Sequence, residues 1–218
     1  DPIITLLGHL FLVAAFLGLL WYASYAMLNF DSRALLQIYT QQHSFADFTP
    51  NWGLYWYFFQ QMFDDFRSFW VWVFNFNACA YAFPLACRLW ALDASGIFLY
   101  ILYLALGCLL SPYPTLADVS FYLTLAFLVY PKYMTSVRGG FIYVYFSFGM
   151  LFLGPVFYFS WTVSGTGNAN FFYFLTLAFN ACQVMFLGQF LTQGMADAKL
   201  RLDEMEKEAA LAVAKKED

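Results

Sequence analysis

Long apolar runs, separated by short polar connectors, make up most of this chain. A helix needs about 20 mostly apolar residues to cross a bilayer. Four runs meet that length: Ile3–Leu28, Phe66–Trp90, Phe141–Val163 and Phe171–Leu191. Two shorter runs end at prolines: Gly96–Leu110 and Val119–Tyr130. Short runs of this kind occur in helices that are broken or surrounded by other helices. The pattern predicts an all-α fold, a polytopic transmembrane helix bundle with about six crossings in this chain.

Composition supports the bilayer as solvent and excludes other classes. The chain of 218 residues is 62% hydrophobic, 23% aromatic and 11% charged, whereas soluble domains are roughly 45–50% apolar and about 25% charged. Its 28 Phe, 16 Tyr and 7 Trp exclude disorder. A net charge of −4 without a basic stripe argues against a nucleic-acid partner.

The basic residues indicate an orientation, because cytosolic loops are enriched in Lys and Arg. If the six runs alternate, one side carries five of them: Arg88, Lys132, Arg138, Lys199 and Arg201. The other side carries Arg33 and Arg67. The first side is therefore predicted to be cytosolic. The opposite, lumenal or exoplasmic, side then holds residues 31–65, 111–118 and 165–170.

Two regions follow from this pattern. Residues 1–192 are predicted to form one transmembrane helical domain with a lumenal segment at 31–65. Residues 193–218 change to charged composition, and their apolar positions recur at helical spacing. We expect this tail to be a cytosolic helix that continues the last crossing.

Motifs for catalysis or metal binding are missing from the sequence. The four cysteines have no C-x-x-C spacing, and His9 and His43 lie far apart. There is no G-x-S-x-G, H-E-x-x-H or phosphate-binding glycine loop. The sequence therefore predicts no metal, no cofactor and no catalysis by this chain alone.

Three charges stand just before an apolar run: Asp64, Asp65 and Arg67. Asp64 and Arg67 share a helix face at i,i+3, so they can form an intrahelical ion pair. The alternative is recognition of a polar headgroup or ammonium at the membrane boundary. Asp65 projects about 100° away from Asp64, which argues against a catalytic carboxylate pair.

Amide side chains form a second group of candidates. Asn168 and Asn170 precede the last crossing, and one of them is expected to cap the helix predicted to start at Phe171. The other would then be available to a sugar, a phosphate or a partner loop. Amides inside the apolar runs are expected to join helices by hydrogen bonds rather than to contact a ligand: Asn75, Asn77, Asn180, Gln183 and Gln189.

Three separated motifs resemble one known family. Phe45-Ala-Asp-Phe-Thr-Pro-Asn-Trp-Gly-Leu-Tyr-Trp-Tyr-Phe-Phe-Gln-Gln-Met-Phe-Asp64 is similar to the D-L-T-P-N-x-G-L-x-W-Y-F-F-x-E-M-F motif of the PIG-U family. Ser111-Pro-Tyr-Pro-Thr-Leu-Ala-Asp118 resembles its S-Y-P-T-x-x-D. Asn168-Ala-Asn-Phe-Phe-Tyr-Phe-Leu-Thr-Leu-Ala-Phe-Asn180 resembles its N-S-N-F-F-Y-x-x-T-L-x-F-N. The resemblance runs from about Phe45 to Leu191 and corresponds to the family's C-terminal half.

The resemblance implies a non-catalytic subunit of the glycosylphosphatidylinositol (GPI) transamidase of the endoplasmic reticulum membrane. In that complex the PIG-K subunit does the chemistry, and the PIG-U fold is similar to that of GT-C glycosyltransferases. Implied partners are PIG-K, PIG-T, PIG-S, the GPI-anchor attachment protein, the GPI lipid and a proprotein with a GPI signal. Gln61 stands where the family motif has Glu, whereas Asp64 is an acidic residue at the next acidic position of the motif.

A GPI binder needs an apolar or aromatic groove below lumenal polar groups, because GPI has acyl chains in the bilayer and a glycan above it. We expect Asn168, Asn170 and Asp64 to border the headgroup and Phe69 to line the chain groove. Three further residues complete the candidate site for GPI or for the hydrophobic signal: Asn51, Trp56 and Arg67.

Two alternatives to a recognition subunit stay open: a fragment of a GT-C lipid-linked mannosyltransferase, and a structural scaffold of the complex. Independently of the family, Lys215 and Lys216 stand fourth and third from the end, as in a di-lysine signal for retrieval to the endoplasmic reticulum. Two alternatives for this pair stay open: an ordinary charged helix end, or a natural C-terminus other than Asp218.

Overall fold

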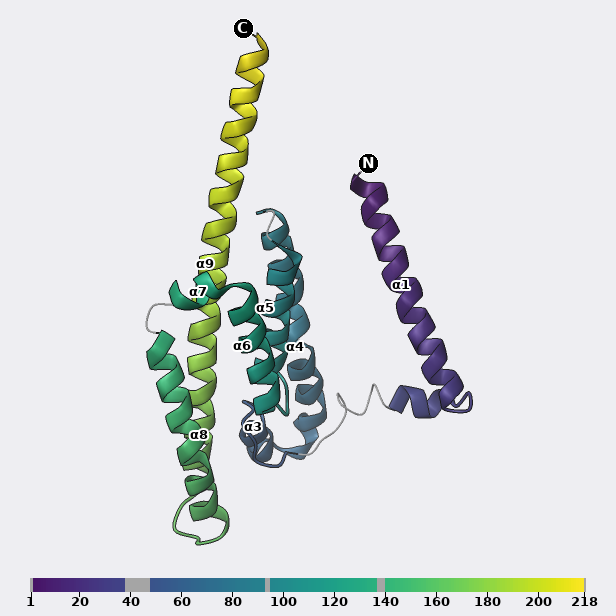
Figure 1. The fold of residues 1–218 in the computed structure, drawn as a ribbon. Coiled ribbons are helices and arrows are strands. Elements are labelled where there is room, and N and C mark those ends of the chain that lie inside the picture. The colour runs from purple at the N-terminus through teal and green to yellow at the C-terminus, as the bar shows by residue number, and fades with distance from the viewer. Residues whose placement is uncertain (1, 38–47, 93–94, 137–139, 218) are drawn as a thin grey trace. The chain divides into compact units, whose positions relative to one another are not determined.

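The computed structural model describes residues 2–37, 48–92, 95–136 and 140–217 (Figure 1). Every regular element in these ranges is a helix, so the all-α prediction is confirmed for them. Contacts divide the chain into two compact units, residues 1–47 and 48–218.

The first unit contains helix α1 (Pro2–Met27). Asn29 and Phe30 then take left-handed backbone conformations with φ of 53° and 61°, which turns the chain. Helical residues 32–37 follow, and the Asp31 carboxylate accepts from the backbone N–H of Arg33 at 2.8 Å. An Asp in this position satisfies a donor at the start of a helix.

The second unit contains the other helices. They are α3 (Trp56–Gln61), α4 (Asp64–Trp90), α5 (Gly96–Leu109), α6 (Leu116–Val129), α7 (Pro131–Ser136), α8 (Gly140–Thr162) and α9 (Ala169–Glu217). Helix α5 contacts α4, α6 and α9, and α8 packs along α9 as an antiparallel hairpin (Figure 1). Helix α9 has 49 residues and so extends roughly 73 Å.

Local chemistry fixes the short helices. Pro112 and Pro114 lie between α5 and α6, where neither helix can continue. Helix α6 then begins with a capping box, in which Thr115 Oγ1 accepts from Asp118 N at 3.1 Å and Asp118 Oδ2 accepts from Thr115 N at 2.9 Å. Pro131 ends α6, since the residue before proline avoids helical geometry.

The main core lies where α4, α5, α6, α7 and α9 meet. Its buried members are Leu89, Phe98, Ile101, Leu102, Ala126, Tyr133, Phe186 and Phe190. A glycine makes this packing possible, because a Cβ on Gly194 of α9 would overlap the ring of Phe98 of α5. Small residues at helix contacts allow such close approach.

The connectors of the second unit gather at two ends. At one end Gly53 lies against the Pro112 carbonyl, and Trp56 stacks on Trp161 near the end of α8. At the other end, residues from α4, α5 and α7 share one cluster: Leu89, Phe98 and Tyr133. The parts of the predicted lumenal connectors that belong to this unit thus share one of its ends.

Two described helices, by length and composition, are long and apolar enough to cross a membrane: Ile142–Thr162 and Ala169–Ala210. Three shorter apolar helices are Phe11–Met27, Gly96–Leu109 and Leu116–Val129, and the 14 residues of α5 and of α6 each span about 21 Å. Helix α4 has 27 residues but is not among the helices apolar enough to cross. The described structure thus supports two of the six expected crossings.

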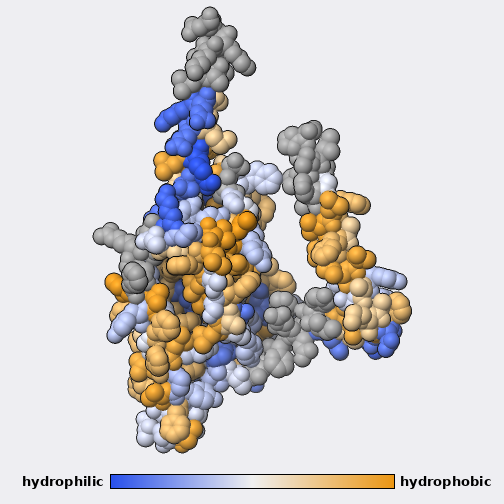
Figure 2. All heavy atoms as spheres, viewed as in Figure 1, coloured by the Kyte–Doolittle hydropathy of each residue, from blue (hydrophilic) through white to orange (hydrophobic). Residues whose placement is uncertain are grey.

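The surface of the second unit changes along α9. Apolar residues cover α8, whose apolar window is only 6% buried, and hydrophilic residues gather where α9 extends beyond the other helices (Figure 2). The core helix of a soluble protein would be mostly buried, so the exposed surface of α8 is that of a helix that faces lipid or another apolar partner.

Candidate functional site

Residues 48–61, which we call the docked segment, carry most of the first motif and pack against the α8–α9 hairpin. The Trp52 indole lies 5.8 Å from the Phe172 ring and 5.4 Å from the Phe179 ring, measured between centroids. Gly154 of α8 makes room for it, because a Cβ there would stand 2.5 Å from two indole carbons. The segment is therefore held by shape as well as by apolar contact.

Trp56 anchors the same segment one turn further along. Its side chain is only 1% exposed and lies among the rings of Trp161, Phe172 and Tyr173, at centroid distances of 6.1, 5.8 and 5.6 Å. Aromatic pairs at such distances stabilise beyond their buried area. Trp56 is thus a core residue of the candidate site rather than part of its open surface.

Three hydrogen bonds join the docked segment to α9. Asn180 Nδ2 donates to the Trp52 carbonyl at 2.8 Å. The Tyr173 hydroxyl donates to the Leu54 carbonyl at 3.0 Å. The Tyr57 hydroxyl donates to Asn170 Oδ1.

The two asparagines at the start of α9 take different roles. The Asn168 side chain accepts from the backbone N–H of Asn170 at 3.0 Å and so caps α9, which begins at Ala169, two residues earlier than expected. The Asn170 side chain bonds Tyr57 of the docked segment. Both asparagines remain exposed. The expected cap is therefore present, and Asn170, which was expected to be available to a sugar, a phosphate or a partner loop, contacts α3 of the same chain.

The second motif joins the same cluster. Asn51 Oδ1 accepts from Gly53 N at 2.6 Å, which tightens the turn before Trp52. A Cβ on Gly53 would stand 2.9 Å from both the Pro112 carbonyl oxygen and Pro114 Cδ. Only glycine fits between the two loops, so the three motifs of the sequence meet at one end of the unit.

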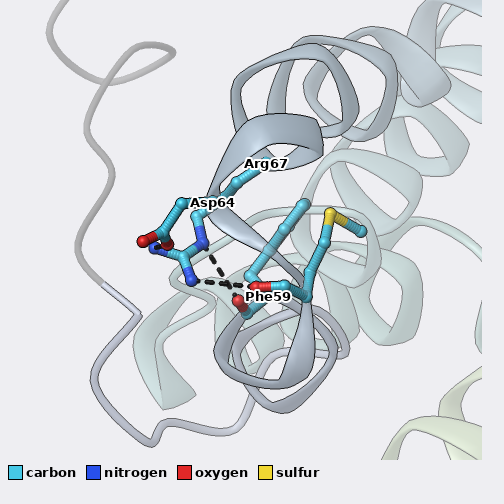
Figure 3. A network of polar contacts seen from close by, with 4 residues as sticks. Phe59, Asp64 and Arg67 are labelled. Atoms are coloured by element: carbon cyan, nitrogen blue, oxygen red, sulfur yellow. Dashed lines mark hydrogen bonds and ion pairs between the residues drawn. The ribbon is translucent and has the colours of Figure 1, made fainter.

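Arg67 of α4 closes the end of α3 (Figure 3). Its guanidinium donates to the carbonyls of Phe59 at 3.1 Å and Met62 at 3.0 Å, and it pairs with Asp64 at 2.6 Å. It also lies 5.3 Å from the centroid of the Phe48 ring. The expected intrahelical pair is present, and Arg67 uses its donors inside the protein.

Asp64 and Phe69 lie outside this packing. The Asp64 side chain is 86% exposed despite its ion pair, and Phe69 is 63% exposed on the outer surface of α4. Of the predicted site residues, Asn51, Trp56, Asn168 and Asn170 belong to one cluster. Asp64 and Arg67 border it through α3, whereas Phe69 lies apart from it.

Sequence reasoning missed Tyr57 and Tyr173 as members of the site. Their rings stack with centroids 4.6 Å apart, and each hydroxyl bonds across the contact between the docked segment and α9. Both tyrosines lie inside the quoted motifs, so the motifs contained the signal. Their pairing across more than a hundred residues did not follow from either motif alone.

Two of the five amides predicted to join helices are seen to do so, Gln183 and Gln189 of α9. Gln183 Nε2 donates to Asn180 Oδ1 at 3.3 Å, and the Tyr122 hydroxyl of α6 donates to Gln183 Oε1 at 3.0 Å. Gln189 Nε2 donates to the Tyr143 hydroxyl of α8 at 2.6 Å. Such bonds link apolar helices where water is absent.

At the opposite end, α9 is tied to α7. The Tyr133 hydroxyl donates to Asp197 at 2.7 Å, and Arg201 pairs with Asp197 at 3.4 Å. Burial and the bond to Asp197 raise the pKa of Tyr133 to about 12, so the phenol remains a donor at neutral pH. Lys215 and Lys216 lie in α9, but their side chains are outside the described part of the structure.

The arrangement offers binding groups rather than reactive ones. Its polar groups are amides and phenols, which donate and accept hydrogen bonds without being charged at neutral pH. Within the residues that the structure describes, no three His, Cys, Asp or Glu side chains gather as a metal site would require.

Comparison with known proteins assigns the chain to a family. Residues 2–179 match the family model described as "GPI transamidase subunit PIG-U". This match begins before the first motif and ends before Leu191, so it extends the resemblance toward the N-terminus. The match covers α1 and nearly all of the candidate site.

Curated relatives agree with that model. The chain is 35% identical over 147 residues to "GPI-anchor transamidase component PIGU" of Homo sapiens, which is 67% of this chain and 33% of the human protein. It is 34% identical over 162 residues to "GPI transamidase component GAB1" of Saccharomyces cerevisiae, which is 72% of this chain and 39% of the yeast protein. The matched region is thus about a third of these relatives' length. The chain belongs to the PIG-U family of GPI transamidase subunits.

Proposed function

We propose that this chain acts within a GPI transamidase complex and that the edge formed by Asn168, Asn170 and Tyr57 contacts the polar headgroup of GPI. The observation that carries the proposal is the convergence of the three motifs at one end of an apolar helix bundle. Exposed amides there stand directly above aromatic packing. That order of groups matches a glycolipid, whose glycan is polar and whose chains are apolar.

The acyl chains would lie along α4. Phe66 and Phe69 are 61% and 63% exposed on its surface, and Asp64 stands at the polar end of the same helix. Asp64 would contact the headgroup with the oxygen lone pairs that its pair with Arg67 does not use. Asn51, Trp56 and Arg67 would serve by holding the docked segment in position.

The proposed membrane arrangement follows the charge distribution. The end that holds the docked segment faces the lumen of the endoplasmic reticulum, and the extension of α9 lies in the cytosol. Helices α4, α5, α6, α8 and α9 then cross or enter the bilayer, and α1 is proposed as a separate crossing. The short α5 contacts α4, α6 and α9, which supports its placement among longer helices, and the short α6 packs on α5 and α7.

Catalysis is proposed to reside in another subunit. The candidate site contains amides, indoles and phenols, and none of these supplies an activated nucleophile next to a base. PIG-K, PIG-T, PIG-S and the GPI-anchor attachment protein are the proposed partners. The relatives are named as transamidase components, which favours this function over a mannosyltransferase.

The test uses a variant that combines Asn168→Lys with Asn170→Lys in the full-length subunit. We expect the complex to assemble and GPI transfer to fall, because two long cations would occupy the polar edge. The control replaces both residues with Ser, which keeps a helix cap and adds no bulk or charge. Retained GPI transfer together with normal assembly of the Lys variant would refute the proposal. A pure scaffold would show unchanged GPI binding in both variants.

A further inference from the structure

Asn180 makes a part-buried polar contact that reaches from the first quarter of α9 to the docked segment. Its side chain is 2% exposed. One amide hydrogen points to the Trp52 carbonyl at 2.8 Å and the other to the Thr176 carbonyl at 2.7 Å. Its oxygen accepts from Gln183 at 3.3 Å. Both donors of the amide are therefore used, and the oxygen is held from the next turn of the helix.

The partners of Asn180 fix its direction. Thr176 lies one turn before it on the same helix, and Gln183 is itself fixed by the Tyr122 hydroxyl at 3.0 Å. With one N–H and the oxygen fixed in this way, the remaining N–H has a single orientation. It reaches Trp52, which lies 128 positions earlier in the chain.

Three contacts with α9 set the register of the docked segment. Asn180 bonds Trp52, Tyr173 bonds Leu54, and Asn170 bonds Tyr57. Positions 170, 173 and 180 fall within about 80° of one another around a helix and cover roughly 15 Å of its length. The segment therefore runs antiparallel to α9, and its outermost contact is the proposed headgroup edge.

We propose that Asn180 is the positioning residue for that edge: it holds the Trp52 carbonyl from inside the helix bundle and thereby sets where Tyr57 meets Asn170. This inference rests on the proposed function, because the edge matters only if it contacts GPI. Asn180 touches no ligand itself. A donor lost here leaves the Trp52 carbonyl in apolar surroundings, and the carbonyl must move to find another partner.

The test is an Asn180→Leu variant in the assembled full-length complex, with purified GPI and a reporter proprotein in detergent micelles. We expect the apparent KM for GPI to rise roughly threefold to tenfold, the effect of one lost hydrogen bond, with kcat unchanged. The matched control is Gln189→Leu, which removes an amide from the same helix. Its bond goes to Tyr143 of α8 rather than to the docked segment, so KM should stay at the wild-type value.

A double-mutant cycle separates positioning from general loss of stability. If Asn180 acts through the edge, Asn180→Leu and Tyr57→Phe together should raise KM by less than the product of their separate effects. Multiplying effects would overturn the inference. If Asn180→Leu prevents assembly, Tyr173→Phe tests the same register by removing only the bond to the Leu54 carbonyl. An unchanged KM in that variant would then overturn the inference.

Two outcomes distinguish this inference from the proposed function. An unchanged KM in Asn180→Leu, with a raised KM in the Asn168→Lys and Asn170→Lys variant, would overturn the positioning role and leave the proposed function in place. An unchanged KM in both variants would overturn both.

Discussion

Gly154 offers the sharpest test of how the docked segment is held. In a Gly154→Ala variant the new Cβ would stand 2.5 Å from two carbons of the Trp52 indole, whereas carbon atoms in contact prefer about 3.5–4.0 Å. The indole would have to move by roughly 1 Å. It is confined by the Phe172 and Phe179 rings, and its backbone carbonyl is bonded to Asn180.

The expected cost of this displacement is that of overpacking a core, about 1–3 kcal/mol. Gly149→Ala is the matched control, because it lies on the same helix and its Cβ would meet nothing within 4 Å. Both variants gain the same helix propensity, up to about 1 kcal/mol. The difference between them therefore isolates the contact with Trp52.

The assay is denaturant-induced unfolding of each variant in the same detergent. We expect Gly154→Ala to be less stable than Gly149→Ala by about 1–3 kcal/mol in the free energy of unfolding. It should also show a higher KM for GPI, because the docked segment carries Tyr57 of the proposed edge. Equal stability of the two variants would show that Trp52 does not pack on α8. The proposed site would then lack the contact that holds the docked segment in place.

Three further outcomes follow from other contacts. Gly194→Ala should destabilise the bundle by about 1–3 kcal/mol relative to Gly188→Ala in the same unfolding assay. The methyl added at position 194 meets the Phe98 ring, whereas the one added at position 188 meets nothing within 4 Å. Equal free energies of unfolding would contradict the packing of α5 on α9. Arg67→Ala should release the end of α3 and speed protease cleavage there. Asp64→Asn should change the free energy of unfolding by less than about 1 kcal/mol, because the Asp64 side chain is exposed. Equal cleavage rates in the two variants would refute the role of Arg67 at the end of α3. A surface reporter that carries residues 193–218 should return to the endoplasmic reticulum, and it should stay at the surface once the lysines at 215 and 216 are replaced by serine. A reporter that stays at the surface with both lysines intact would refute the retrieval signal.

Apolar runs and prolines were sufficient to predict α1, α4, α5, α6, α8 and α9, because each depends on neighbouring residues alone, whereas the six-residue helices α3 and α7 were not predicted. The run predicted from Phe66 begins at Asp64 in the structure, and the last helix continues into the tail as expected. Helix α5 and helix α6 are too short for an independent crossing, and their role depends on the helices around them. That dependence is why the count of six was not settled by periodicity.

The candidate site was only partly predictable for the same reason. The helix cap by Asn168 and the ion pair of Arg67 with Asp64 depend only on spacing along one helix, and the structure contains both. Trp56 was expected to take part in the candidate binding site, but it is buried because Trp161 and Tyr173 come from other elements to cover it. Contacts between distant segments depend on the way the chain folds back on itself, which residue spacing does not contain.

The most direct test of the central claim is a lipid-resolved structure of the whole complex with GPI bound. The account predicts that the glycan headgroup lies within hydrogen-bond distance of Asn168 or Asn170, with Tyr57 beside it and the acyl chains along the Phe69 side of α4. A headgroup bound elsewhere, with these three side chains contacting only protein, would contradict it.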